Sequence, residues 1–161
     1  MRRILLLALL SFAVLAPAAS ARTVDLPKLF ATQLERAPAR SDVPILLPQT
    51  MRADFRRFFP EGRARLNTWR LDVGAVRGCH QATACFIAEF RASRDGRPSG
   101  RRTVGLARGR TGHFHPVSCG ASCSPASIEW RERGALYSIQ AKVAKRELVR
   151  MADSAIRNGP R

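Results

Sequence analysis

The residues best suited to chemistry are four cysteines and three histidines. They are Cys79, Cys85, Cys119, Cys123, His80, His113 and His115. Thiols form disulfides, bind metal ions or exchange electrons, and imidazoles bind metal ions or transfer protons. Each of these chemistries needs a particular compartment and spacing, so the rest of the sequence decides among them.

The beginning of the chain indicates the compartment. Met1-Arg2-Arg3 precedes an apolar run from Ile4 to Ala16, and the small residues Ala19-Ser20-Ala21 follow. This order is typical of a secretory signal peptide, and the run is shorter than the roughly 18 to 20 apolar residues that span a bilayer. We therefore expect segment 1–21 to be removed near Ala21. The mature protein would then be periplasmic or secreted, with no transmembrane span.

An even number of cysteines in an exported chain predicts disulfides, because that compartment is oxidising. Local pairing would join Cys79 to Cys85 and Cys119 to Cys123. Either crossed pairing would close rings of about 40 residues, which stabilise by roughly 4 kcal/mol against roughly 2 kcal/mol for a short ring. We favour local pairing because those partners meet more readily during oxidation. The crossed pairings remain alternatives.

A metal site is the alternative use of these residues. On a strand, His113 and His115 would point to one face, where both imidazoles could reach one ion. One cysteine spacing suits zinc and the other does not, and export tends to oxidise the thiolates that zinc needs. We expect no cofactor and no metal, and we keep the two histidines as the metal candidates.

Catalytic motifs are absent from the sequence. The pair Cys119 and Cys123 is one residue longer than a thioredoxin-like motif, and a strand rather than a helix is predicted after it. Nucleophile elbow, His-Glu-x-x-His and phosphate loop are all missing. Among the scattered carboxylates, we expect Asp72 and Glu89 to form surface ion pairs. We therefore expect that the protein is not an enzyme.

The formal net charge of +16 predicts attraction to polyanions such as nucleic acid or lipopolysaccharide, or to a membrane surface. The anion-binding candidates are Arg52, Arg56, Arg57, Arg63, Arg65, Arg101, Arg102, Arg108 and Arg110. The alternative is compositional. Lysine occurs only at Lys28, Lys142 and Lys145, and a GC-rich genome produces such an arginine bias without selection for binding.

The residue pattern of the N-terminal third predicts a helix, then a linker and then a segment rich in aromatic residues. Within 22–43, Leu26, Leu29, Phe30 and Leu34 have helical spacing, and an extended linker from Ala37 to Pro44 follows. The apolar residues after Pro44 suit an edge strand or the point where the chain enters a core. Phe55, Phe58 and Phe59 lie among arginines; we expect these rings in the core, with stacking on bases or sugars as the alternative.

The remainder predicts strands and a final helix. Alternation indicates strands around Trp69–Val73, Phe86–Phe90 and Val104–Leu106, and then a hairpin over Ile128–Ala141. An amphipathic helix follows Lys145 and stops at Asn158-Gly159-Pro160. We expect an α+β fold, a single domain over 44–161, in which an antiparallel β-sheet of four to six strands packs against N- and C-terminal helices.

The segment "ASIEWRERGALYSIQAKVAKRELVRMADSAI" combines a strand ending in Trp, a tight turn, a Gly-x-x-Tyr strand and a helix. It resembles the closing part of small exported bacterial domains of unknown function, which are similar in shape to the PsbP-like α/β sandwich. "VPILLPQT" resembles the Pro-flanked strand that often opens such domains. The resemblance implies a fold and brings no catalytic residue with it.

Together these features predict a non-enzymatic exported domain, stapled by disulfides, that binds a protein or an envelope component. The first alternative is a basic binder of anionic polymers or of a membrane surface. The second alternative is a metal-binding protein that uses His113 and His115.

Overall fold

The computed structural model describes residues 21–100 and 102–161. The predicted signal peptide lies outside these residues except for Ala21. Within the described ranges, no helix is long and apolar enough to cross a membrane. The described elements pack around one hydrophobic core.

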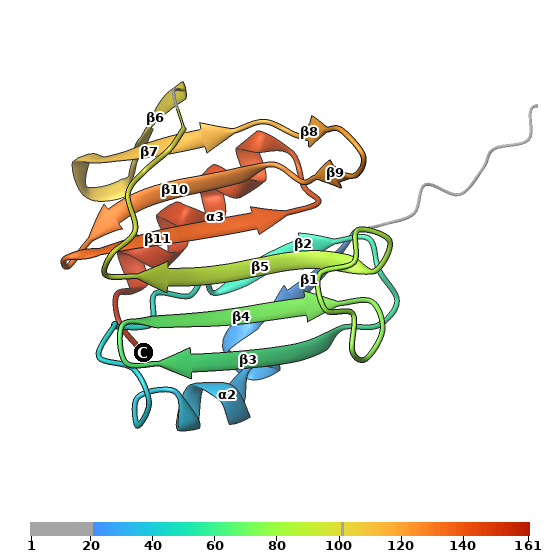
Figure 1. The fold of residues 1–161 in the computed structure, drawn as a ribbon, viewed down its shortest axis with the longest axis horizontal. Coiled ribbons are helices and arrows are strands. Elements are labelled where there is room, and N and C mark those ends of the chain that lie inside the picture. Colours follow the sequence, from blue (N-terminus) through green and yellow to red (C-terminus); the bar gives the residue numbers. More distant parts are fainter. Residues whose placement is uncertain (1–20, 101) are drawn as a thin grey trace, which may run out of the picture.

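A seven-stranded antiparallel sheet forms the centre of the fold (Figure 1). In chain order its strands are β3 (Phe59–Arg65), β4 (Thr68–Gly74), β5 (Phe86–Ser93), β6 (Arg102–Leu106), β7 (Arg110–His115), β10 (Ser127–Glu132) and β11 (Ala135–Ala141). Across the sheet the order is β3-β4-β5-β11-β10-β7-β6. The predicted α+β class and antiparallel sheet are confirmed, with seven strands instead of four to six.

Short elements complete the fold. The strand β1 (Arg22–Asp25) pairs with β2 (Thr50–Ala53), and β8 (Ser118–Cys119) pairs with β9 (Cys123–Ser124). The helices are α1 (Leu26–Leu29), α2 (Ala31–Arg36), the 3₁₀-helix η1 (Ala107–Gly109) and α3 (Lys145–Asn158). The predicted C-terminal helix is therefore present at full length, while the N-terminal helix is reduced to two short pieces.

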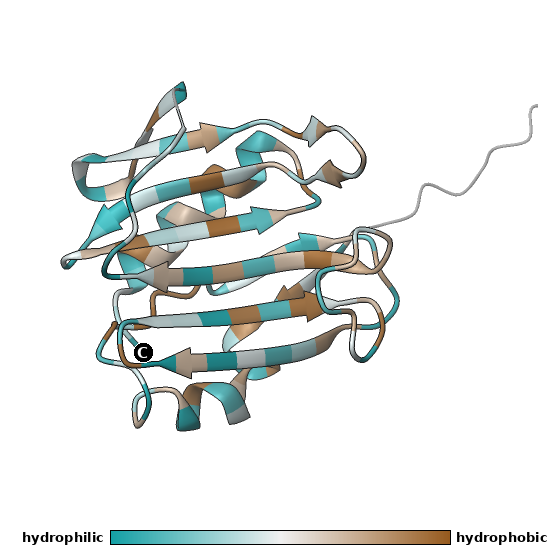
Figure 2. Ribbon diagram, viewed as in Figure 1, coloured by the Kyte–Doolittle hydropathy of each residue, from teal (hydrophilic) through white to brown (hydrophobic). Residues whose placement is uncertain are grey.

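One face of the sheet is covered and the other is open. In Figure 1 the helix α3 lies behind β10 and β11. It buries the face formed by Leu148, Met151, Ala152, Ala155 and Ile156. Figure 2 shows apolar and polar residues alternating along the central strands, as half-buried strands require. The apolar residues face the helix side, and the polar residues face the viewer.

The N-terminal helix is interrupted at Phe30. Asp25 caps α1, because its carboxylate accepts a hydrogen bond from the Lys28 backbone N–H at 2.9 Å. The backbone of Phe30 leaves helical geometry, with ψ at 16°, and α2 begins after it. Its ring is fully buried and meets Phe90 edge-on, with centroids 6.2 Å apart. Tertiary packing of this ring explains why one predicted helix becomes two.

The predicted linker from Ala37 to Pro44 is buried only at Ala37, Ser41 and Val43. The apolar residues Ile45–Leu47 after it are buried and form no strand, so the chain enters the core there, and β2 begins only at Thr50. The Pro44 carbonyl accepts hydrogen bonds from Trp69 Nε1 at 3.2 Å and from the Tyr137 hydroxyl at 2.9 Å. This irregular segment is therefore tied to two strands of the sheet through one carbonyl group.

The aromatic residues of the β2–β3 region enter the core only in part. Phe55 and Phe58 are half-buried and pack against the core from its edge. Phe59 is also half-buried, and the Arg77 guanidinium lies over its ring, 5.5 Å from the centroid. Both the rings and the arginine contribute to the rim of the fold.

Tyr137 is the single tyrosine of the chain, so its titration can be followed without interference. Burial, with a smaller contribution from the charge of Glu132, raises the pKa of its phenol to about 12. We expect ultraviolet absorbance to report tyrosinate formation near pH 12 in the folded protein, and near the ordinary value of about 10 in denaturant.

Proton linkage gives the direction in which the stability of the protein changes with pH. Between these two pH values the unfolded chain has already released the proton that the folded chain keeps, so stability falls as pH rises through this window. The Tyr137→Phe variant is the control, because it should show no such absorbance change. A midpoint near 10 with an intact circular dichroism spectrum would contradict the buried, hydrogen-bonded position of the phenol.

Candidate functional site

The open face of the sheet carries two neighbouring rows of opposite charge across β3, β4 and β5. Side chains at alternate positions share a face, and paired residues lie side by side. The acidic row is Glu61, Asp72 and Glu89, and the basic row is Arg63, Arg70 and Arg91. Like charges in each row repel, so each row depends on the other for compensation.

Ion pairs connect the two rows. Arg70 Nε lies 2.9 Å from a carboxylate oxygen of Asp72 and 3.1 Å from one of Glu89. Arg91 Nε lies 3.4 Å from Glu89, and its Nη2 lies 3.7 Å from Glu129. The side chains of Glu89 and Glu129 are only 5% and 7% exposed, whereas that of Arg91 is 54% exposed. The carboxylates therefore lie beneath guanidinium groups that reach solvent.

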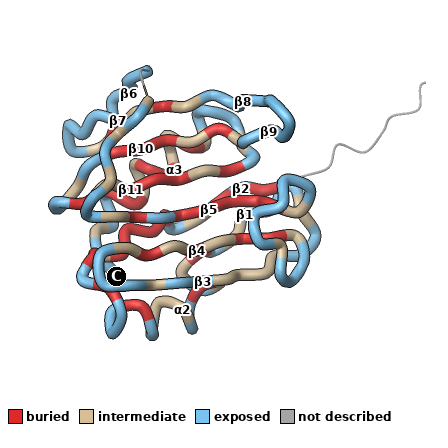
Figure 3. The backbone as a smooth tube through the Cα atoms, in the orientation of Figure 1, coloured by how far each residue is buried: buried red, intermediate tan, exposed pale blue. Residues whose placement is uncertain are grey.

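This arrangement corrects the expectation that Glu89 forms a surface ion pair. Its alternation with Phe90 does place it on the polar face, but Gln81 from the loop between β4 and β5 and the arginine partners of Glu89 contact it. Figure 3 shows β5 as a largely buried strand in the centre of the sheet. Asp72 is partly buried in the same network. Strand alternation predicts the face on which a residue lies, but it does not predict whether a loop covers that face.

Burial changes the titration of both carboxyl groups. Desolvation raises the pKa of Glu89, and the charges of Arg70 and Arg91 only partly offset it. Desolvation likewise raises the pKa of Asp72 against the opposing effect of Arg70. A carboxyl group whose pKa is raised by folding costs stability once both states are ionised. The ionised carboxylate of Glu89 therefore lowers the free energy of unfolding.

The two disulfides are Cys79–Cys85 and Cys119–Cys123, which confirms the local pairing. The first closes the loop between β4 and β5, from which Gln81 Nε2 donates a hydrogen bond to Glu89. Gln81 has φ at 65°, a left-handed conformation that residues other than glycine rarely adopt. The closed loop thus holds an unfavourable conformation that places Gln81 over the buried carboxylate.

The second disulfide closes the β8–β9 hairpin, which lies between β7 and β10 in the sequence. Both of its cysteines are exposed. The two disulfide loops meet where the Thr83 hydroxyl donates to the Cys123 carbonyl at 3.5 Å.

The two metal candidates lie on one face of β7, as predicted, but contact different groups. His113 Nδ1 donates to the Gly100 carbonyl at 2.9 Å, and His115 Nε2 lies 3.2 Å from a Glu129 oxygen. Within residues 21–100 and 102–161, no cluster of three or more metal-ligating side chains is positioned to hold an ion. The third histidine, His80, is exposed in the first disulfide loop.

Glu129 joins β10 to the loop between β5 and β6. The same oxygen that contacts His115 accepts hydrogen bonds from the Ser99 N–H at 3.1 Å and from its hydroxyl at 3.3 Å. A nucleophilic serine needs its base within hydrogen-bonding reach, but here the carboxylate lies between the serine and the imidazole. The arrangement seats a loop and does not form a serine–histidine relay.

The predicted anion-binding arginines are distributed over the whole fold. Arg63 and Arg65 lie on the edge strand β3, while Arg102, Arg108 and Arg110 lie at the opposite edge. Arg110 is paired with Glu132 at 2.7 Å. Arg52 lies on β2, Arg56 and Arg57 are exposed in the β2–β3 connection, and Arg101 lies outside the described residues.

Only part of the basic row was found from the sequence. Arg63 was a candidate, but Arg70 and Arg91, which join it across the strands, were not. Both occupy the outward position of a strongly alternating strand, and this was the available signal. The pairing of β3, β4 and β5 in this register was needed to align the three.

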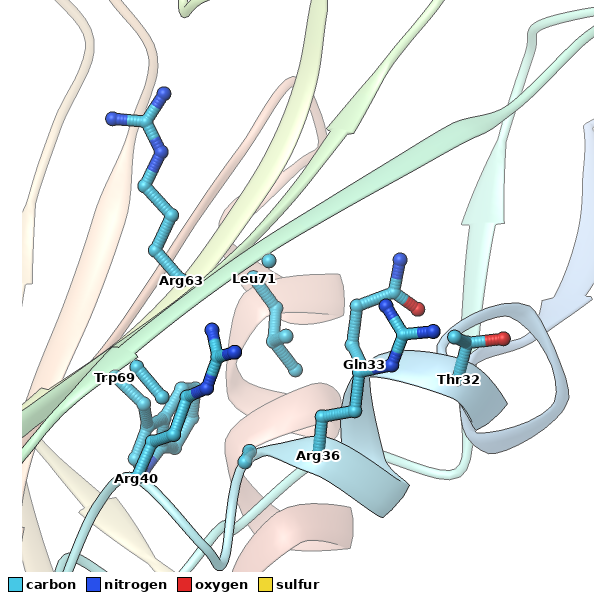
Figure 4. Close-up of a pocket in the computed structure, with 10 residues that line it drawn as sticks. Thr32, Gln33, Arg36, Arg40, Arg63, Trp69 and Leu71 are labelled. Carbon is cyan, nitrogen blue, oxygen red and sulfur yellow. The ribbon is translucent and has the colours of Figure 1, made fainter.

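A hollow with a volume of about 170 Å³ lies between α2 and the strands β3 and β4 (Figure 4). Arg36 and Arg40 border it, and Trp69 lies at its base. The helix approaches closely because Gly62 has no side chain; a Cβ there would lie 2.7 Å from Gln33 Cγ. Figure 4 shows Arg63 directed away from this hollow, toward the open face.

Comparisons of the chain with protein-family models, curated proteins and solved structures find no match.

The two disulfides allow a matched pair of stability experiments. We expect Cys79→Ser/Cys85→Ser and Cys119→Ser/Cys123→Ser each to lower the free energy of unfolding in urea by about 2 kcal/mol, because both close short rings. Only the first variant should also shift the NMR signals of the Arg70 and Arg91 Nε–H groups, since only that loop contacts Glu89. Equal shifts in the two variants would contradict this assignment.

Proposed function

We propose that this protein is an exported, non-enzymatic binding domain that docks an anionic component of the cell envelope on the open face of its sheet. The observation that carries the proposal is the basic row of Arg63, Arg70 and Arg91, in which Arg70 and Arg91 pair with the buried carboxylate of Glu89. The two disulfides fit an oxidising compartment outside the cytoplasm.

The buried carboxylates support this proposal because they fix the arginines in place. A free arginine loses rotamer entropy when a ligand immobilises it, and a positioned guanidinium has already lost part of that entropy. Both ion pairs of Arg70 use its Nε, and no described residue bonds its terminal NH₂ groups. Those groups can bind the planar or tetrahedral oxygens of carboxylate or phosphate.

The charge of the whole chain supports the same ligand class. A formal net charge of +16 attracts polyanions over distances of about one Debye length, roughly 8 to 10 Å at physiological salt. The open face would then select among the attracted polymers through its fixed geometry. This combines long-range attraction with short-range recognition.

The order of the groups around Glu129 supports a binding role rather than catalysis. Ser99 and His115 both direct their polar atoms to the carboxylate, and neither activates the other. Each of these contacts also holds a loop or strand in position.

Purified lipopolysaccharide is a direct probe of this function. We expect saturable binding that weakens as salt is raised. The variant Arg63→Gln/Arg65→Gln removes two exposed charges of the open face and should weaken binding at least about tenfold. The matched control Arg36→Gln/Arg40→Gln removes the same charge from the hollow beside α2 and should bind nearly as the unchanged protein does.

Two outcomes would overturn the proposal. One is equal weakening in both variants, which would make the attraction a property of net charge alone. The other is the absence of saturable binding to lipopolysaccharide at low salt.

A further inference from the structure

We propose that the cavity beneath the loop 94–100 binds a sugar unit that carries a carboxylate or phosphate group. The cavity has a volume of about 350 Å³ and opens on the same face as the basic row. The inference rests on the proposed function, because it names the part of the envelope component that the open face would grip.

The cavity lies beneath the loop 94–100, which approaches the sheet closely at Gly96 and Gly100. A Cβ at Gly96 would lie 2.8 Å from Leu136 Cβ, and one at Gly100 would lie 2.8 Å from His115 Nε2. Arg131 Nη1 also donates to the Gly96 carbonyl at 2.7 Å. The loop therefore touches the strands at both of its ends, and the residues between them arch over the space that remains.

Ser138 is the feature that points to a ligand. It is only 4% exposed, it lines the cavity, and no described residue hydrogen-bonds its hydroxyl. Its register places it between Arg91 of β5 and Glu129 of β10, facing the loop. A hydroxyl that faces a cavity can donate one hydrogen bond and accept another, so Ser138 can bind a ligand oxygen at this position.

The charges around Ser138 select an anionic group. Arg91 and Arg97 both line the cavity, and Arg97 forms no ion pair within the described part of the chain. Two guanidinium groups and one hydroxyl match the oxygens of a carboxylate or a phosphate. The Arg91 guanidinium and the hydrogen bond from the Ser99 N–H offset part of the charge of Glu129, which reduces its repulsion of an anionic ligand.

The rest of the lining suits a sugar. Glu129 can accept a hydrogen bond from a ligand hydroxyl through its second oxygen, which is only loosely held by Arg91 at 3.7 Å. Leu136, which lies on the same face of β11 as Ser138, provides an apolar wall for the C–H face of the ring. The volume is near the lower end of the roughly 300–1,000 Å³ typical of ligand pockets, which suits one sugar unit.

Titration calorimetry and NMR shifts test this site with glucuronate and glucose 6-phosphate as anionic sugars, and with glucose and inorganic phosphate as partial ligands. We expect the anionic sugars to bind at least about tenfold more tightly than either partial ligand, since they combine both sets of contacts. Their shifts should centre on Ser99 and Ser138. Ser138→Ala and Arg97→Gln should each weaken binding about five- to tenfold.

Arg36→Gln is the control, because it removes the same charge as Arg97→Gln from outside the cavity and should leave sugar binding unchanged. Equal binding of glucose, shifts centred elsewhere, or equal weakening by Arg36→Gln would overturn the inference. Lipopolysaccharide binding that depends on Arg63 and Arg65 while no anionic sugar binds would overturn this site alone. Loss of both kinds of binding would also overturn the proposed function.

Discussion

The burial of two carboxylates on the open face is the constraint on which the rest of this surface depends. Glu89 and Glu129 are nearly inaccessible to solvent, so each must be compensated by charges and hydrogen bonds. Arg70 and Arg91 provide the charges, and the loops provide hydrogen bonds from Gln81 and Ser99. The buried carboxylates of Glu89 and Glu129 therefore determine where the guanidinium groups of Arg70 and Arg91 lie.

The two faces of the sheet are stabilised by different physical effects. On the helix side, apolar burial dominates, and the Pro44 carbonyl accepts hydrogen bonds from Trp69 and Tyr137. The buried Trp130 Nε1 has no hydrogen-bond partner among the described residues. On the open face, ion pairs replace apolar contacts, and desolvation makes the carboxylates costly. Replacing such a network with apolar residues often preserves or improves stability, so the ion pairs of this face are weak evidence for a stabilising role.

The loops convert this surface from a flat sheet into a shaped site. The first disulfide restrains the loop that carries Gln81, and two glycines let the loop 94–100 lie directly on the strands. Between that loop and β11 a cavity remains, and Ser138 lies in its floor. The arginines of the basic row therefore lie beside a cavity on the same face, and Arg91 belongs to both.

The sequence by itself predicted several of the strands and the final helix, because these depend on alternation and helical periodicity. It favoured the local disulfides through ease of ring closure but left the crossed pairings open. Trp69–Val73, the hairpin over Ile128–Ala141 and the helix after Lys145 all lie where their patterns predict them. Only the tertiary structure decided that Glu89 is buried and that Arg70 joins Arg63 and Arg91 in one row. The reason is that strand order, register and loop return are long-range properties, whereas alternation specifies only which residues share a face.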